Sequence, residues 1–101
     1  MDVICNKDNS TVTITIDEPL NAKHLSDLQE KVKEVHLGFG SHLILDCSGM
    51  DYICSSGLRE FLGMAKQAKE VGADMKIKGV QPLVKNVFDM TGFTQLFTFE
   101  D

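Results

Sequence analysis

Apolar and polar residues alternate in residues 11–17, where Val12, Ile14 and Ile16 occupy every second position between threonines and an aspartate. A period of two with β-branched residues is typical of a half-buried strand. Residues 2–6 also predict a strand, and the polar residues 7–10 between the two segments favour a turn. The pattern therefore predicts that the chain begins with an antiparallel β-hairpin.

A helical pattern follows in the next segment. Its apolar residues Leu25, Leu28, Val32 and Val35 recur every three or four positions, with charged residues between them. This spacing predicts an amphipathic helix over residues 22–36. Asn21 precedes the first turn and is the expected N-cap.

Strands and helices alternate through the rest of the sequence. Short apolar runs predict strands at residues 43–47, 75–78 and 96–100, and the first is expected to be buried on both faces. One helix is expected from residue 58 to Gly72, and another from Pro82 to Gly92. The order β-β-α-β-α-β-α-β predicts a single α/β domain over residues 1–101, with a mainly parallel central sheet, an antiparallel N-terminal hairpin and helices packed on it.

Composition narrows the classes of partner. Fifteen acidic and ten basic residues give a formal charge of −5, which disfavours nucleic acid and anionic lipid as partners. The longest apolar runs are far too short to span a membrane, and no basic-then-apolar leader opens the sequence, so a soluble cytoplasmic protein is expected. Cys5, Cys47 and Cys54 form no CxxC pair and no histidine lies at metal-ligand spacing from them, so they are interpreted as free thiols, with neither metal nor cofactor expected.

The junction Cys54-Ser-Ser-Gly-Leu58 separates a predicted strand from a predicted helix. The first turn of a helix has unpaired N–H groups and the positive end of the helix dipole, so it can accept a capping hydroxyl or a phosphate. In a purely structural interpretation, Ser55 or Ser56 is an N-cap and Gly57 makes room for packing. In a functional interpretation, Ser55 is modified and Gly57 lets a partner approach the turn closely.

No catalytic motif is present, since the sequence contains no GxSxG elbow, P-loop, HExxH or GxGxxG after a strand. His42, Asp46 and Asp51 lie near Ser55 in the sequence, so a Ser-His-Asp enzyme is kept as a further hypothesis. That hypothesis would require a concave pocket beside Ser55. No catalytic residue is assigned, and the chain is expected not to be an enzyme.

Two segments closely resemble the signatures of STAS domains. Residues 43–58, LILDCSGMDYICSSGL, match an apolar strand ending in Leu-Asp, a loop, and an Asp-Ser-Ser/Thr-Gly-Leu motif that opens a helix. Residues 80–93, VQPLVKNVFDMTGF, match a Pro-opened helix that ends in a Thr-Gly turn, and residues 71–77 match the helix end and strand between the signatures. The resemblance extends from about residue 11 to residue 100 and implies a STAS-like sandwich.

Stand-alone members of this family are mostly anti-sigma-factor antagonists, so the resemblance implies partner switching. The unphosphorylated antagonist binds a serine kinase that is also an anti-sigma factor, and this frees the sigma factor. The kinase then phosphorylates the first serine of the motif, which is Ser55 here with Ser56 as second choice, and a PP2C-type phosphatase reverses the modification. The partner-binding surface expected from this comparison comprises Asn21, Lys23, Ser55, Ser56, Gly57, Arg59, Gly63 and Lys66, although Arg59 and Lys66 also fit an ordinary solvated helix face.

Several positions depart from the family pattern. Cys54 replaces the Asp before the phosphorylated serine, and the Gly-x-Leu-Asp of the first loop has Asp17 for its glycine and Asn21 for its acid. These changes are expected to tune phosphorylation and kinase choice. The sequence ends at Asp101, where many relatives continue into a C-terminal helix, and this leaves room for weak self-association.

The alternative function is a STAS subunit that is never phosphorylated, in a transport or signalling complex such as a lipid-transport ATPase. The replacements at Cys54 and Asn21 favour this alternative. It predicts a permanent, mostly hydrophobic contact face, whereas the switch predicts a polar surface around Ser55.

Overall fold

The computed structural model describes the backbone of residues 2–6 and 11–100 and the side chains of residues 11–100. Within these residues the elements follow the predicted alternation of strands and helices. They are β1 (Asp2–Asn6), β2 (Thr11–Thr15), α1 (Ala22–Lys33), β3 (His42–Asp46), α2 (Ser55–Glu70), β4 (Asp74–Lys78), α3 (Pro82–Thr91), the short 3-10 helix η1 (Thr94–Leu96) and β5 (Thr98–Glu100).

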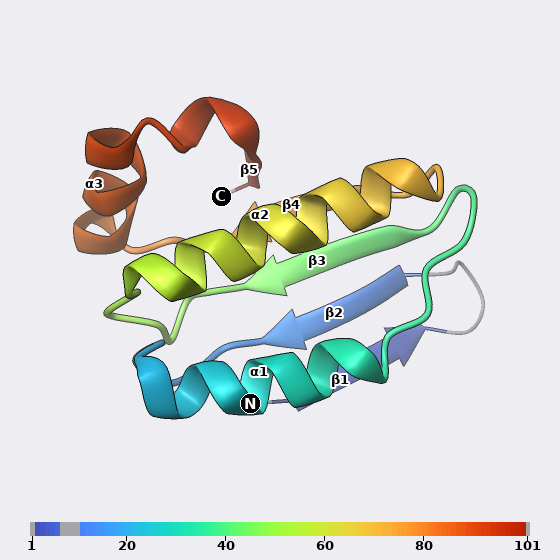
Figure 1. Ribbon diagram of the computed structural model, residues 1–101, viewed down its shortest axis with the longest axis horizontal. Helices are drawn as coiled ribbons and strands as arrows, with labels where there is room; N and C mark the ends of the chain where they lie inside the picture. Colours follow the sequence, from blue (N-terminus) through green and yellow to red (C-terminus); the bar gives the residue numbers. More distant parts are fainter. Residues whose placement is uncertain (1, 7–10, 101) are drawn as a thin grey trace.

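The strands form one sheet in the order β1-β2-β3-β4-β5 (Figure 1). Strands β2, β3, β4 and β5 run parallel to one another, as the sequence predicted. Strand β1 pairs with β2 in the antiparallel sense, with Val3 opposite Ile14. The turn predicted at residues 7–10 lies outside the described residues.

The three helices of the described chain connect neighbouring parallel strands. Each crossover moves to the next strand in the same direction, so crossovers of the usual right-handed sense place all three helices on one face. Figure 1 shows α1 and α2 lying side by side in front of the sheet. The prediction that the strand at residues 43–47 is covered on both faces is therefore wrong: Leu43 and Leu45 are buried, while Ile44 and Asp46 are only half-buried.

The core lies between the helices and the covered face of the sheet. Buried side chains from the strands meet buried side chains from the helices, among them Ile14, Leu45, Ile77, Leu28, Leu58, Phe61, Met64, Val84 and Phe88. Phe88 of α3 stacks against Phe61 of α2 with 6.3 Å between ring centroids and meets Phe97 and Phe99 edge-on. These contacts join the C-terminal part of the chain to the central helix.

Two helix boundaries differ from the predicted ones, because the apolar pattern continues past the end of α1 and begins only after the start of α2. Helix α1 ends at Lys33, although Val35 still packs against the core from the loop that follows. Helix α2 begins at Ser55, one turn before the first predicted residue. Helix α3 agrees with prediction, because Pro82 stands at its start and Gly92 ends it with φ of 76°.

Candidate functional site

The loops that precede α1 and α2 are hydrogen-bonded to each other at the carboxyl edge of the parallel strands. Leu20 and Ile53 form an isolated parallel bridge. The amide of Leu20 donates to the Tyr52 carbonyl over 2.7 Å, and the amide of Cys54 donates to the Leu20 carbonyl over 3.0 Å. The bridge places the first turns of α1 and α2 next to each other, as Figure 1 shows at the left of the view.

The start of α1 is held by side-chain contacts within its own loop. The Oδ1 atom of Asn21 accepts a hydrogen bond from the His24 amide over 3.0 Å, which confirms the predicted N-cap. The Nδ1 atom of His24 lies 2.7 Å from the Pro19 carbonyl oxygen, and its Nε2 atom lies 3.1 Å from Oε2 of Glu18. A carbonyl oxygen only accepts, so Nδ1 carries a proton and His24 ties the loop to the first turn of α1. Lys23 is exposed beside it.

The start of α2 has an exposed serine and lacks a side-chain cap. Cys54 is the N-cap residue in an extended conformation, with no hydrogen bond from its side chain to the helix. Neither Ser55 nor Ser56 therefore caps the helix, contrary to the structural interpretation of these serines. Both lie within the first turn and are exposed, so the Ser55 hydroxyl is open to an approaching enzyme.

Gly57 is buried under the bridge between the two loops. A Cβ atom at this position would lie 2.9 Å from Cδ2 of Leu20 and 3.0 Å from Cγ1 of Ile53. Such distances are tighter than van der Waals contact permits, so any larger residue would force the buried side chains of Leu20 and Ile53 to move. Gly57 was expected on the partner-binding surface, but it is buried and cannot contact a partner. Its close packing against Leu20 and Ile53 instead positions the turn that carries Ser55.

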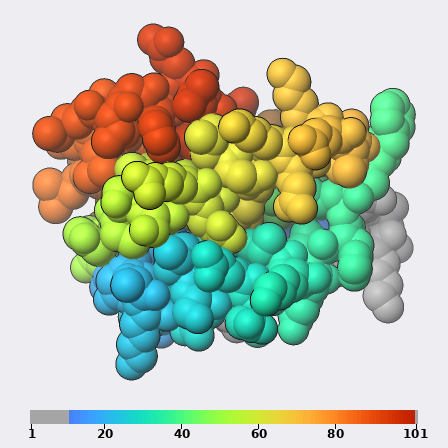
Figure 2. All heavy atoms as spheres, viewed as in Figure 1, coloured from blue at the N-terminus to red at the C-terminus, as the bar shows by residue number. Residues whose placement is uncertain are grey.

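The other residues expected on the partner-binding surface are all exposed. From α2 these are Ser55, Ser56, Arg59, Gly63 and Lys66, and from the α1 loop and first turn they are Asn21 and Lys23. Ser55, Arg59, Gly63 and Lys66 follow one another at intervals of four, four and three residues, so they share one face of α2. Figure 2 shows α2 as a surface band between α1 and α3.

The proposed Ser-His-Asp arrangement is not formed. His42 begins β3, whereas Ser55 follows the loop beyond the opposite end of that strand, and four residues of strand separate Cα atoms by about 13 Å. The Nδ1 atom of His42 instead lies 2.9 Å from Oδ1 of Asp74. Asp46 accepts hydrogen bonds from the amide and the hydroxyl of Ser48, over 3.1 and 2.8 Å.

Two cavities stand out among the described residues, and neither of these two is lined by Ser55 or Ser56. The larger lies between α1 and α2 near the amino edge of the parallel strands, and the smaller lies at the end of α3 around Asp89 and Gly92. The larger cavity was not anticipated from the sequence, because residues far apart in the chain line it. Its sequence signal is limited to Leu37, an apolar residue just beyond the predicted helix of residues 22–36.

The thiols of the described residues differ in exposure. Cys47 is fully buried, and burial raises the pKa of its thiol to about 12, with a smaller contribution from the charge of Asp46. Cys54 is half-buried beside Ser55.

No group of three or more His, Cys, Asp or Glu side chains in residues 11–100 is arranged to hold a metal ion. No α-helix of the described chain is long and apolar enough to cross a membrane.

Comparison with known proteins agrees with the resemblance noted in the sequence. The family model described as STAS domain matches residues 2–101. The chain is also 38% identical over 55 residues to the protein named "Putative anti-sigma factor antagonist BtrV" of Bordetella bronchiseptica strain RB50. That alignment covers 54% of this chain and 47% of the relative, so the match spans about half of each. With its family signatures, its α/β order and a match along nearly its whole length, the chain belongs to the STAS domain family.

Proposed function

We propose that this chain is an anti-sigma-factor antagonist-like regulator, which binds a serine-kinase anti-sigma factor and is released when Ser55 is phosphorylated. The observation that carries the proposal is the exposed Ser55 hydroxyl in the first turn of α2, beside the loop that contains Asn21. Ser56, also exposed, is the second candidate for the modified residue. A PP2C-type phosphatase would restore the binding form, and the cycle would operate in the cytoplasm.

A phosphate on Ser55 would be compatible with the fold of the free protein and would weaken the binding of a partner. Phosphorylation adds roughly −1.5 to −2 charges at pH 7. The first turn of α2 has no acidic residue, and Arg59 lies one turn further along the same helix face. Both features favour the added charge within the free protein. In a complex, the same charge would have to be desolvated against the partner, which favours dissociation.

The charges of the exposed surface favour an acidic partner. The charged residues nearest Ser55 along its face of α2 are Arg59 and Lys66, and Lys23 is exposed at the start of α1, although the whole chain carries a formal charge of −5. Opposite charges on a partner would speed association and set its orientation. The exposed Gly63 has no atom within 4 Å of a Cβ built at its position, so a partner can approach α2 closely there.

A regulator that is phosphorylated by a kinase needs no catalytic groups of its own. In phosphoryl transfer the kinase supplies the nucleotide, the metal ion and the residue that accepts the hydroxyl proton. The substrate serine needs only to be reachable.

The test is to incubate the purified protein with ATP and lysate of its host and to map phosphate by mass spectrometry. Ser55→Ala and Ser56→Ala form a matched pair of variants. We expect phosphate on Ser55 in the wild type and in Ser56→Ala, and none at this turn in Ser55→Ala. A kinase retained by the unphosphorylated protein should be released on adding ATP. Phosphate only on Ser56, or none at either serine with an active host kinase present, would contradict the proposal.

The second candidate is a constitutive subunit of a transport or signalling complex. It is favoured by Cys54 in place of the family's acid and by two exposed apolar side chains on α3, since Leu83 is 72% and Met90 is 86% exposed. A partner bound through α3 would be retained with and without ATP, and Leu83→Ser with Met90→Ser would abolish its retention. The switch predicts instead that Ser55→Asp weakens partner binding more than these α3 changes do.

A further inference from the structure

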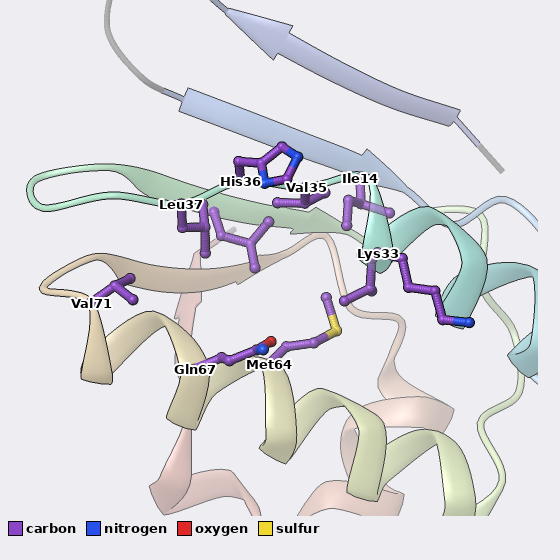
Figure 3. Close-up of a pocket in the computed structure, with 10 residues that line it drawn as sticks. Ile14, Lys33, Val35, His36, Leu37, Met64, Gln67 and Val71 are labelled. Atoms are coloured by element: carbon purple, nitrogen blue, oxygen red, sulfur yellow. The ribbon is translucent and has the colours of Figure 1, made fainter.

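The larger cavity is a groove between the C-terminal halves of α1 and α2, with β2 and β3 beneath it (Figure 3). Its volume is about 350 Å³. Small-molecule sites commonly measure about 300 to 1,000 Å³, so the groove is large enough for a small ligand. It lies toward the far end of α2 from Ser55, because Met64, Gln67 and Val71 line it.

The lining of the groove is aliphatic at its base and bears hydrogen-bond donors around its edge. Its apolar residues are Ile14, Val32, Val35, Leu37, Leu43, Met64 and Val71, none of which is aromatic. A flexible Met and branched aliphatic side chains suit an alkyl chain better than a planar ring, since the His36 imidazole is the one ring in this lining.

The polar residues of the lining are Lys33, His36 and Gln67. None is a carboxylate, although acidic residues outnumber basic ones in the chain as a whole. In the part of the chain that the structure describes, the His36 ring and the Gln67 amide form no hydrogen bond. Lys33 lies 3.6 Å from Glu30, and both side chains are about three-quarters exposed, so this ion pair is weak. The edge of the groove therefore complements a negative group.

We propose that this groove binds a free straight-chain carboxylic acid of medium length. The alkyl chain lies between Met64 of α2 and Leu37 of the loop after α1, which Figure 3 shows on opposite sides of the groove. The carboxylate lies at the edge, where His36, Gln67 and Lys33 supply donors and positive charge. This site is separate from Ser55 and does not depend on the function proposed above.

Octanoate titrated into protein labelled on its methionine methyl groups tests the proposal by NMR. Met64 lines the groove, whereas Met50 is buried in the core and Met90 is exposed on α3, so the latter two are internal controls. We expect a saturable shift of the Met64 methyl signal and little change at Met50 and Met90. Each methylene should tighten binding about threefold to fourfold from hexanoate to octanoate, as expected for burial of one methylene.

A pair of variants tests the location of the site, and a pair of ligand head groups tests the preference for a carboxylate. Gln67→Trp should fill the groove and abolish the Met64 shift, whereas Gln29→Trp, on an exposed position of α1 outside the lining, should leave it unchanged. Octylamine should bind at least tenfold more weakly than octanoate, and His36→Gln with Lys33→Gln should reduce that preference. Equal affinity for octanoate and octylamine would overturn the carboxylate assignment.

Two other results would overturn the proposal as a whole. One is the absence of a saturable Met64 shift with octanoate when the spectrum shows a folded protein. The other is a Met64 shift that depends on protein concentration without any ligand, because the groove would then be a contact between copies of this chain.

Discussion

The amide of Cys54 donates a hydrogen bond to the carbonyl of Leu20 over 3.0 Å, and this contact joins the loop before α2 to the loop before α1. The two loops are far apart in the sequence, yet they present Ser55 and Asn21 on one exposed edge of the molecule. The geometry of the serine turn therefore depends on Leu20 as well as on the residues of its own motif.

Substitution of the buried glycine in this turn should destabilise the fold. In Gly57→Ala the new methyl group would lie 2.9 Å from Cδ2 of Leu20 and 3.0 Å from Cγ1 of Ile53, so these buried side chains must shift. We expect the free energy of unfolding to fall by about 1–3 kcal/mol, the usual cost of overpacking. Urea denaturation measures this change, and a loss below about 0.5 kcal/mol would show that the two side chains adapt without strain.

The exposed glycine of the same helix should behave in the opposite way. Gly63 has open space around it, so Gly63→Ala should raise the free energy of unfolding by roughly 0.5–1 kcal/mol through lower backbone entropy of the unfolded chain. If a partner approaches α2 at this point, the same methyl group should reduce partner affinity in a pull-down or calorimetric titration. A variant that is more stable and binds with unchanged affinity would place the partner elsewhere.

Restoring an acid at the start of α2 should stabilise the helix. Cys54 forms no side-chain cap, whereas the carboxylate of Cys54→Asp can accept a backbone N–H and lies at the positive end of the helix dipole. We expect a gain of about 0.5–1.5 kcal/mol at pH 7 by chemical denaturation. The gain should be lost below about pH 3, where the carboxylate is protonated. Cys54→Ala, which also lacks a cap, serves as control and should show no such gain.

The buried thiol should make stability fall at alkaline pH. Burial, with a smaller effect of the Asp46 charge, raises the pKa of Cys47 from 9.0 to about 12. Because the folded protein holds this proton more tightly than the unfolded chain, its contribution is complete below pH 9 and is lost as pH rises toward 12. The expected slope is about 1.4 kcal/mol per pH unit within that window.

Denaturation of the wild type and Cys47→Ala across pH 8 to about 11 isolates this contribution, because the other titrating groups are common to both proteins. The variant should be less stable at pH 8, since it leaves a cavity in the core. The difference between the two proteins should narrow as pH rises. A constant difference across the range would show that the Cys47 thiol does not titrate between the two pKa values.

Local sequence rules identified several elements of this fold correctly. Asn21 caps α1, Pro82 opens α3 and Gly92 ends it, because each effect involves only neighbouring backbone groups. The start of α2 was placed a turn too late, since Ser55, Ser56 and Gly57 contribute no apolar periodicity. The bridge between Leu20 and Ile53, which orients that turn, has no signal in either loop taken alone.

The sequence by itself determined the order of strands and helices, the mainly parallel sheet, the family and the position of the serine motif between a strand and a helix. Periodicity, capping and turn residues act over a few neighbouring positions, so they can be read directly from the chain. Tertiary structure alone decided that the helices cover one face of the sheet, that Gly57 is buried under Leu20, and that α1 and α2 enclose a groove. Each of these depends on contacts between residues far apart in the chain, where packing and burial are set by the whole fold.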